Sequence, residues 1–232
     1  MIGVFFGCTT RSNEYLDANL NNLLKKIKIS FFPLGRELCC GAPFHLAGTE
    51  HDFKEQAKKV KEEIEKQKLN LIITTCPHCF TTLKYEYPKI GIQLEKEVLH
   101  ITQFIKKMID EGNLIFQKKS NKKILYHDPC YIGRQSEGIF DEPREILRKA
   151  GYEIVEFDLN RDNSICCGGG GLLRAYLPKL SVEVSKEKLI TYGKEADFVT
   201  APCPFCYQNL KEGAEGLNYV VKDFIEILLE AL

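Results

Sequence analysis

The sequence lacks a long hydrophobic run, an excess of charge of either sign and a high content of proline or glycine. No apolar stretch approaches the roughly 18 residues that a membrane-spanning helix needs, so we expect no transmembrane segment. The 32 basic residues balance the 32 acidic residues, which removes the positive field that would hold nucleic acid or an anionic membrane. With 9 prolines and 17 glycines in 232 residues, disordered and collagen-like chains are excluded as well.

The N-terminus lacks the basic segment and the long apolar core of a secretory signal peptide. Residues 1–8 indicate a short buried strand instead. We therefore expect a cytoplasmic protein. Because the cytoplasm keeps thiols reduced, metal ligands or redox groups explain the 10 cysteines better than structural disulfides do.

The cysteines form two groups with the same pattern. In each group a single cysteine precedes an adjacent Cys-Cys pair, and 35 residues then separate this pair from a Cys-x-x-Cys motif. This internal repeat predicts two similar domains related by a pseudo-twofold, residues 1–117 and 118–232, with residues 111–123 as the linker. The first group is Cys8, Cys39, Cys40, Cys76 and Cys79, and the second is Cys130, Cys166, Cys167, Cys203 and Cys206.

Both halves alternate short apolar strands with amphipathic helices. This alternation predicts an α/β fold made of two tandem, Rossmann-like domains with parallel sheets. The expected strands are residues 2–6, 69–75, 123–126, 153–157 and 198–200. The expected helices are residues 15–27, 52–67, 142–150, 172–194 and 221–232.

Four cysteines follow directly on predicted strands, at the carboxyl edge where α/β folds bind ligands: Cys8, Cys76, Cys130 and Cys203. Each Cys-x-x-Cys also opens a predicted helix. The amide groups and the positive end of a helix N-terminus stabilise thiolates and anionic clusters. The sequence therefore predicts one ligand site in each half.

Five cysteines are one more than an ordinary metal centre uses. Structural zinc and a cubane 4Fe-4S cluster each take four ligands. Adjacent cysteines cannot easily chelate one iron, but they can hold two neighbouring irons, which favours an iron-sulfur centre of unusual shape. The closely spaced cysteine run of ferredoxins is missing. A zinc-stabilised interaction module that uses four thiolates in a half stays open.

The duplicated pattern resembles the cysteine-rich CCG domain pair found in the B-type subunit of heterodisulfide reductase. Related proteins occur in glycolate and lactate oxidising systems, anaerobic glycerol-3-phosphate dehydrogenase and some archaeal succinate dehydrogenases. Residues 126–130, 141–147 and 160–171 are very similar to the second domain of this family. The resemblance implies two noncubane 4Fe-4S clusters, each held by the five cysteines of one half, with one thiolate bridging.

The same resemblance implies the iron-sulfur catalytic subunit of a heterodisulfide reductase-like complex, which reduces or forms a disulfide or a related sulfur substrate. Cleaving a disulfide takes two electrons, so each cluster could give one. Without a cubane relay of its own, the chain would need a ferredoxin-like iron-sulfur subunit as donor and a flavoprotein subunit behind it. The alternative is an electron-transfer subunit of a glycolate, lactate, glycerol-3-phosphate or succinate dehydrogenase-type complex.

One residue outside the cysteines is a candidate catalytic group. His127 lies three residues before Cys130 and could hydrogen-bond a cluster sulfur or protonate a leaving thiolate. A structural histidine is an equal interpretation. His78 lies inside the first Cys-x-x-Cys, but its counterpart is Phe205, which cannot bind a metal, so we do not expect His78 to be a ligand.

Overall fold

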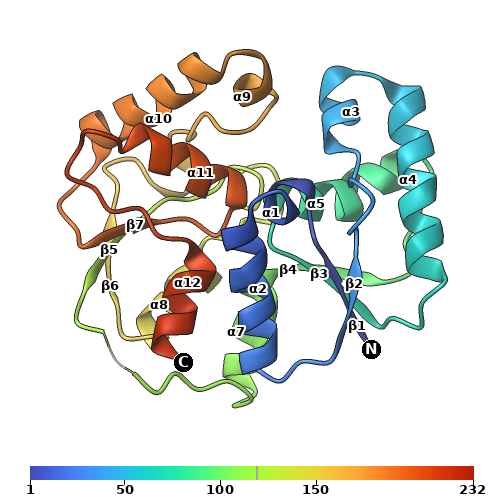
Figure 1. The fold of residues 1–232 in the computed structure, drawn as a ribbon, viewed down its shortest axis with the longest axis horizontal. Coiled ribbons are helices and arrows are strands. Elements are labelled where there is room, and N and C mark those ends of the chain that lie inside the picture. The colour runs from blue at the N-terminus through green and yellow to red at the C-terminus, as the bar shows by residue number, and fades with distance from the viewer. Residues whose placement is uncertain (119) are drawn as a thin grey trace. The chain divides into compact units, whose positions relative to one another are not determined.

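Two parallel β-sheets organise the chain, one in each half of the sequence (Figure 1). The structure is a computed structural model that describes residues 1–118 and 120–232. Its contacts divide the chain into two units, Met1–Phe104 and Ile105–Leu232. The predicted domain boundary after residue 117 stays a prediction, and Lys119 of the predicted linker lies outside the described residues.

The first unit contains a four-stranded sheet in the order β2-β1-β3-β4, with every neighbouring pair parallel. Its strands are β1 (Ile2–Phe5), β2 (Phe31–Leu34), β3 (Leu71–Thr74) and β4 (Glu97–His100). The helical segments that begin in this unit are α1 (Cys8–Arg11), α2 (Glu14–Lys26), α3 (Ala42–Ala47), α4 (Glu50–Glu65), α5 (Pro77–Thr81), the π-helical turn η1 (Thr82–Glu86), α6 (Tyr87–Lys89) and α7 (Ile101–Asp110).

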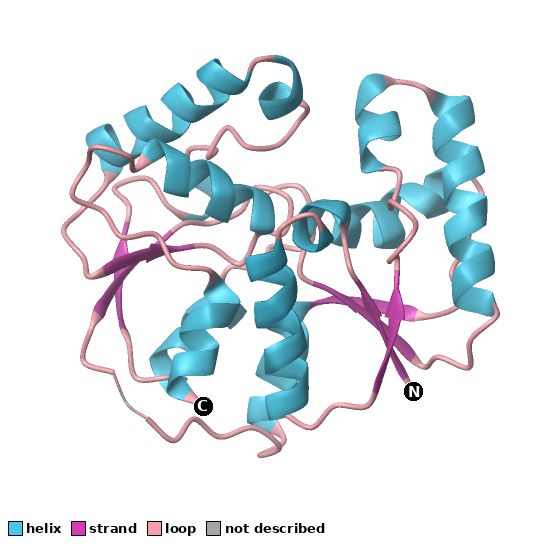
Figure 2. Cartoon of the chain, viewed as in Figure 1, coloured by secondary structure: helices cyan, strands magenta, loops and turns pink. Residues whose placement is uncertain are grey.

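The second unit contains a three-stranded parallel sheet in the order β6-β5-β7. Its strands are β5 (Lys123–Tyr126), β6 (Glu153–Glu156) and β7 (Phe198–Thr200). Its helical segments are α8 (Asp141–Lys149), the 3-10 turn η2 (Arg161–Asn163), α9 (Leu173–Tyr176), α10 (Pro178–Tyr192), α11 (Pro204–Gly213) and α12 (Phe224–Ala231). Figure 2 shows strands and helices in both units, and their alternation along the chain in parallel sheets confirms the predicted α/β fold.

Helix α2 illustrates how local sequence sets an element. The side chain of Asn13 accepts hydrogen bonds from the amides of Tyr15 and Leu16 and so caps the helix start. Its leucines recur at helical spacing, and Leu20 and Leu24 pack against β1 in one buried cluster. The apolar stripe that predicted this helix is therefore its contact with the sheet.

Two predicted helices differ from the structure by more than a shift of one or two residues at their ends. The stretch 172–194 divides into α9 and α10, because Pro178 has no amide hydrogen and is the first residue of a new helix. The closing helix begins at Phe224 rather than at residue 221. Val221 forms a parallel bridge to Val199 instead, in which the amide of Lys222 donates to the Val199 carbonyl over 3.0 Å.

Two strands of the first sheet were not predicted. Strand β2 contains Pro33, which argues against a strand in general but is tolerated here because β2 lies at the sheet edge. Strand β4 runs directly into α7, so the helical pattern obscures it. Among the described residues, no helix combines the length and the apolar character needed to cross a membrane.

Candidate metal centres

The strand ends deliver cysteines to the carboxyl edges of both sheets. Cys8 begins α1 just after β1, and Cys130 follows four residues after the end of β5. Cys76 and Cys203 are the residues that cap α5 and α11, and each is followed by a proline at the first helical position. Both predicted placements, after a strand and at a helix start, are confirmed.

The first cysteine site brings together Cys8, Cys39, Cys40, Cys76 and Cys79. All five are free thiols. Side-chain hydrogen bonds connect them in a fixed order: Cys8 to Cys39, Cys39 to Cys40, Cys40 to Cys79, and Cys79 to Cys76. These hydrogen bonds form a continuous series that begins at the first cysteine of the group, passes through the Cys-Cys pair and ends at the Cys-x-x-Cys motif.

The second cysteine site, formed by Cys130, Cys166, Cys167, Cys203 and Cys206, repeats this order. Its contacts run from Cys130 to Cys166, then to Cys167, Cys206 and Cys203. The sulfur atoms of Cys167 and Cys206 lie 3.3 Å apart. The sequence repeat is therefore also a repeat of side-chain contacts.

Both sites have an open edge and a buried floor. The two cysteines at the open edge are Cys8 and Cys39 in the first site, both half-buried, and Cys130 and Cys166 in the second, where Cys166 is exposed. The remaining three thiols of each site are buried. Only two thiols of each site are therefore accessible from the protein surface.

Backbone amides point at the sulfurs of the second site. The amide of Gly168 donates to Cys166 over 3.3 Å, that of Gly169 to Cys167 over 3.4 Å, and that of Cys206 to Cys203 over 3.3 Å. Amide donors stabilise the thiolate form that metals bind. A close approach explains why a glycine is needed here: a Cβ at Gly169 would lie 2.9 Å from the carbonyl oxygen of Phe205.

Crowding splits the pKa values of these thiols. Hydrogen bonds from Cys130 and Cys167 lower the pKa of Cys166 to about 2, and hydrogen bonds from Cys39 and Cys79 lower that of Cys40 to about 5. The pKa of a thiol that donates its hydrogen shifts in the opposite direction. The pKa of Cys39 rises to about 11, chiefly because of its hydrogen bond to Cys40. Five thiolates this close repel one another, so holding all five deprotonated requires a cation among them.

An arginine connects the loops of each site. Arg11 donates to the carbonyl oxygen of Leu38 over 2.9 Å and also to that of Gly35, which links α1 to the Cys-Cys loop. Arg134 donates to the carbonyl oxygen of Ser164 over 2.5 Å in the second unit. The sequence patterns did not predict this role for the two arginines, although each follows the first cysteine of its group by three or four residues.

Further side chains hold the Cys-Cys backbone. In the first site, Gln56 donates to the carbonyl oxygen of Cys39 and Tyr87 to that of Cys40, both over 2.8 Å. In the second, the amide of Asn209 donates to the carbonyl oxygen of Cys167 over 2.5 Å. Side chains on helices therefore hold the backbone of both Cys-Cys pairs in place.

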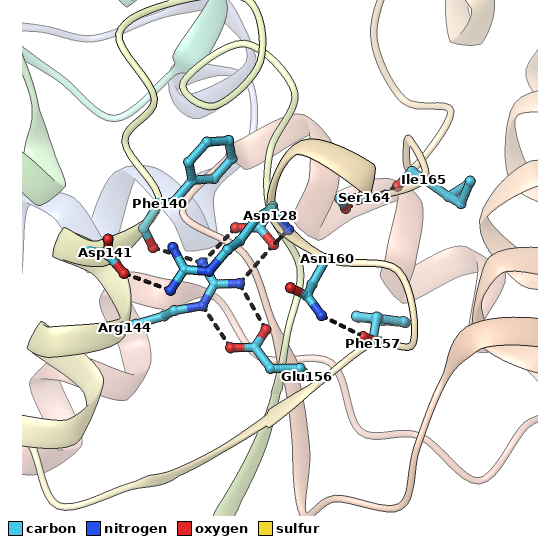
Figure 3. A network of polar contacts seen from close by, with 10 residues as sticks. Asp128, Phe140, Asp141, Arg144, Glu156, Phe157, Asn160, Ser164 and Ile165 are labelled. Atoms are coloured by element: carbon cyan, nitrogen blue, oxygen red, sulfur yellow. Dashed lines mark hydrogen bonds and ion pairs between the residues drawn. The ribbon is translucent and has the colours of Figure 1, made fainter.

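A buried ion network lies behind the second site (Figure 3). Arg144, at 0% exposure, binds the carboxylates of Asp128 and Glu156 with distances of 2.6 to 2.8 Å. Asp128 also accepts the backbone amide of Arg161 over 2.8 Å. The network connects Asp128, which lies two residues after the end of β5 and two before Cys130, to the loop that leads to Cys166.

His127 lies at the second site, as the sequence suggested. Its side chain is 1% exposed, and its ligand atom lies within 4.8 Å of the sulfurs of Cys167 and Cys206. Neither ring nitrogen has a hydrogen-bond partner among the described residues. Burial lowers its pKa well below the usual value, with help from the Lys188 cation. His78 is buried in the first site and hydrogen-bonds Cys76.

Two parallel-sheet units, each with five converging thiols, define a duplicated cysteine-rich domain protein. The chain belongs to the CCG cysteine-rich domain family, which matches residues 2–84 and again residues 124–211. One subunit of the dihydromethanophenazine:CoB--CoM heterodisulfide reductase from Methanosarcina barkeri is 35% identical over 98% of this chain. Residues 1–232 span 58% of that relative's length.

Two further relatives carry other names. An EtfAB:quinone oxidoreductase from Syntrophomonas wolfei is 31% identical over 92% of this chain and 31% of its own length. One subunit of the fumarate reductase (CoM/CoB) from Methanothermobacter marburgensis is 34% identical over 83% of this chain and 38% of its own length. All three relatives are named as oxidoreductases, and their names give different substrates: a heterodisulfide, a quinone and fumarate.

Proposed function

We propose that this chain is the iron-sulfur part of a heterodisulfide reductase-like oxidoreductase, which reduces or forms a disulfide or a related sulfur substrate. The observation that carries the proposal is the repeated contact order of five thiols in both units. A protein with a single redox site would need this arrangement only once. Two matched sites suit a two-electron reaction on sulfur.

The proposed cofactors are two noncubane 4Fe-4S clusters, one held by the five cysteines of each site. The donor set fits, because all ten thiols are free, soft and grouped in fives, whereas zinc or a cubane cluster would leave one thiol over. Such clusters supply one-electron reduction when bound. The chain's own part is to hold the thiols at fixed spacing and to exclude water from the three buried members of each site.

His127 has a proposed role on the buried side of the second site. It lies beside Cys167 and Cys206, whereas the open edge is formed by Cys130 and Cys166. This position favours a hydrogen bond from the imidazole to a cluster sulfur over delivery of a proton to a substrate at the open edge. The sequence had left both roles open.

The proposed electron donors are a ferredoxin-like iron-sulfur subunit and a flavoprotein subunit, and the proposed location is the cytoplasm. The length of the relatives supports a donor outside the described residues, since this chain spans 58% of the heterodisulfide reductase relative and about a third of the quinone oxidoreductase. The relatives therefore contain segments that this chain does not match.

A second candidate is an electron-transfer subunit of a dehydrogenase-type complex. The similarity to a protein named for quinone reduction favours it. Both candidates use the same ten cysteines, so they differ in substrate and not in cofactor. Turnover of a heterodisulfide with a reduced viologen would separate them, because only the first candidate reduces the disulfide.

Iron analysis tests the proposed cofactors. Anaerobically purified protein should be brown and contain about eight irons and a matching amount of sulfide, as two 4Fe-4S clusters require. Cys40→Ser and Cys167→Ser should each remove about half of the iron, and each variant controls for the other. A colourless protein with stoichiometric zinc would refute both iron-sulfur candidates.

A further inference from the structure

The second cysteine site has a buried cation beside it. Lys188 lies on α10 with 1% of its side chain exposed. Its ammonium group donates to the carbonyl oxygen of Ile165 over 2.9 Å and lies 4.2 Å from the centre of the Phe157 ring. Because Ile165 directly precedes Cys166, the positive charge lies next to the Cys-Cys loop. Burial lowers the pKa of Lys188 to about 8, while the thiols of Cys167, Cys206 and Cys166 act on it in the opposite direction.

The first site has no such cation at the equivalent position. Both the Cys-Cys pair and the Cys-x-x-Cys motif shift by 127 positions between the halves, so Lys61 on α4 is the counterpart of Lys188. The side chain of Lys61 is 33% exposed, and its ammonium group lies 3.5 Å from the Glu65 carboxylate. Water and a carboxylate therefore screen the charge of Lys61.

The helix faces explain this difference. Helix α4 buries apolar residues, including Val60 and Ile64. Helix α10 buries Ser181, Ser185, Lys188 and Leu189. Its serines allow close approach, because a Cβ at Gly213 of α11 would lie 2.8 Å from that of Ser185. Because the small serine side chains let α10 pack closely on α11, the side chain of Lys188 is buried.

Other groups among the described residues also act on the two sites. Arg11 and Arg134 occupy matching places. Asp128 also faces Lys188, but Arg144 neutralises it through a bidentate ion pair. In the first site, His78 hydrogen-bonds Cys76 and lowers the pKa of that thiol. Among the described residues, the buried Lys188 ammonium group, whose counterpart Lys61 is partly exposed, therefore distinguishes the second site, and a charge acts strongly in a low-dielectric interior.

We propose that Lys188 makes the centre held by the second cysteine site the more easily reduced of the two, so that the first electron entering the protein resides there. Reduction adds negative charge, which a neighbouring buried cation stabilises. The inference rests on the proposed function, because it requires an iron-sulfur centre in each unit.

A redox titration followed by EPR, with dithionite as reductant, tests this assignment on anaerobically loaded protein. Cys40→Ser and Cys167→Ser identify which signal belongs to which site. Lys188→Met should lower the potential of the second centre enough to change its reduction equilibrium at least tenfold, which is 59 mV for one electron, and should leave the first centre unchanged. Lys188→Arg keeps the charge and should retain most of the potential. The matched control Lys61→Met should move neither centre.

Two results would overturn the inference. One is an unchanged second potential in a fully loaded Lys188→Met protein, and the other is a second centre that titrates below the first in protein with Lys188 intact. The latter comparison decides the matter even if Lys188→Met loses iron. Failure of the proposed function looks different, since iron would then be missing from one or both sites before any titration.

Discussion

Arg144 binds Asp128 through two parallel hydrogen bonds, Nη1 to Oδ1 at 2.6 Å and Nη2 to Oδ2 at 2.8 Å. Since Arg144 is fully buried, removing it would leave the Asp128 carboxylate in the interior without its cation. Breaking a buried pair in this way costs about 3–5 kcal/mol. The pair is therefore a sensitive point of the second unit.

Arg144→Met should lower the free energy of unfolding by about that amount, 3–5 kcal/mol. Urea unfolding followed by circular dichroism measures it. The matched control is Arg148→Met, which changes an exposed arginine on the same helix and should alter stability by less than about 0.5 kcal/mol. Equal effects of the two changes would contradict the importance of the network.

Gly7→Ala should disturb the first site alone. A Cβ at this position would lie 2.9 Å from the sulfur of Cys79 and 3.4 Å from the Cβ of Cys76. The buried floor would have to move, so iron binding by the first site should fall while the second site keeps its signal. Iron content and EPR measure both, and the second site is the internal control. Full iron content with an unchanged spectrum would contradict the prediction.

His127→Phe should change the pH dependence of stability. Burial keeps the folded-state pKa of His127 well below the usual value, so below about pH 6.5 the unfolded chain takes up a proton that the folded protein does not. Stability is therefore lost as the pH falls, by about 1.4 kcal/mol per pH unit from this residue.

The variant should lose that part of the slope between pH 6.5 and 5 in unfolding experiments. Phenylalanine is a suitable replacement, because Phe5 lies three residues before Cys8 just as His127 lies three before Cys130. His51→Gln, which changes an exposed histidine, should keep the slope. A wild-type slope in His127→Phe would show that another group accounts for it.

Cys167→Ser should loosen the backbone around the second site. A hydroxyl oxygen is a poor soft ligand, and metal binding is coupled to folding. Hydrogen exchange should become faster in residues 163–171 and at the start of α11, with Cys40→Ser having the equivalent effect in the first unit. Unchanged exchange together with unchanged iron would refute the five-ligand interpretation.

The sequence patterns predicted the α/β class and the grouping of the cysteines, but not every strand or the buried lysine. The cysteine spacing predicted both groups of five, because a metal centre imposes short-range rules on residue type and distance. Strand β2 was not predicted, because Pro33 is acceptable only in a strand at a sheet edge. Whether a strand lies at the edge is a property of the assembled sheet. Lys188 escaped for a similar reason: its burial depends on how α10 packs on α11, and a lysine on a charged helix otherwise indicates a solvated face.

The exposed thiol of Cys166 is the expected first site of oxidation. This thiol is exposed, and the hydrogen bonds from Cys130 and Cys167 favour its thiolate form, whereas the cysteines at the open edge of the first site are half-buried. Oxidation follows thiolate character and exposure, so it would proceed through sulfenic acid at Cys166 before it reached the first unit. Metal-free protein handled briefly in air would therefore be a mixture in which the second site is oxidised while the first is intact, and aged preparations would differ from fresh ones in a single half of the molecule.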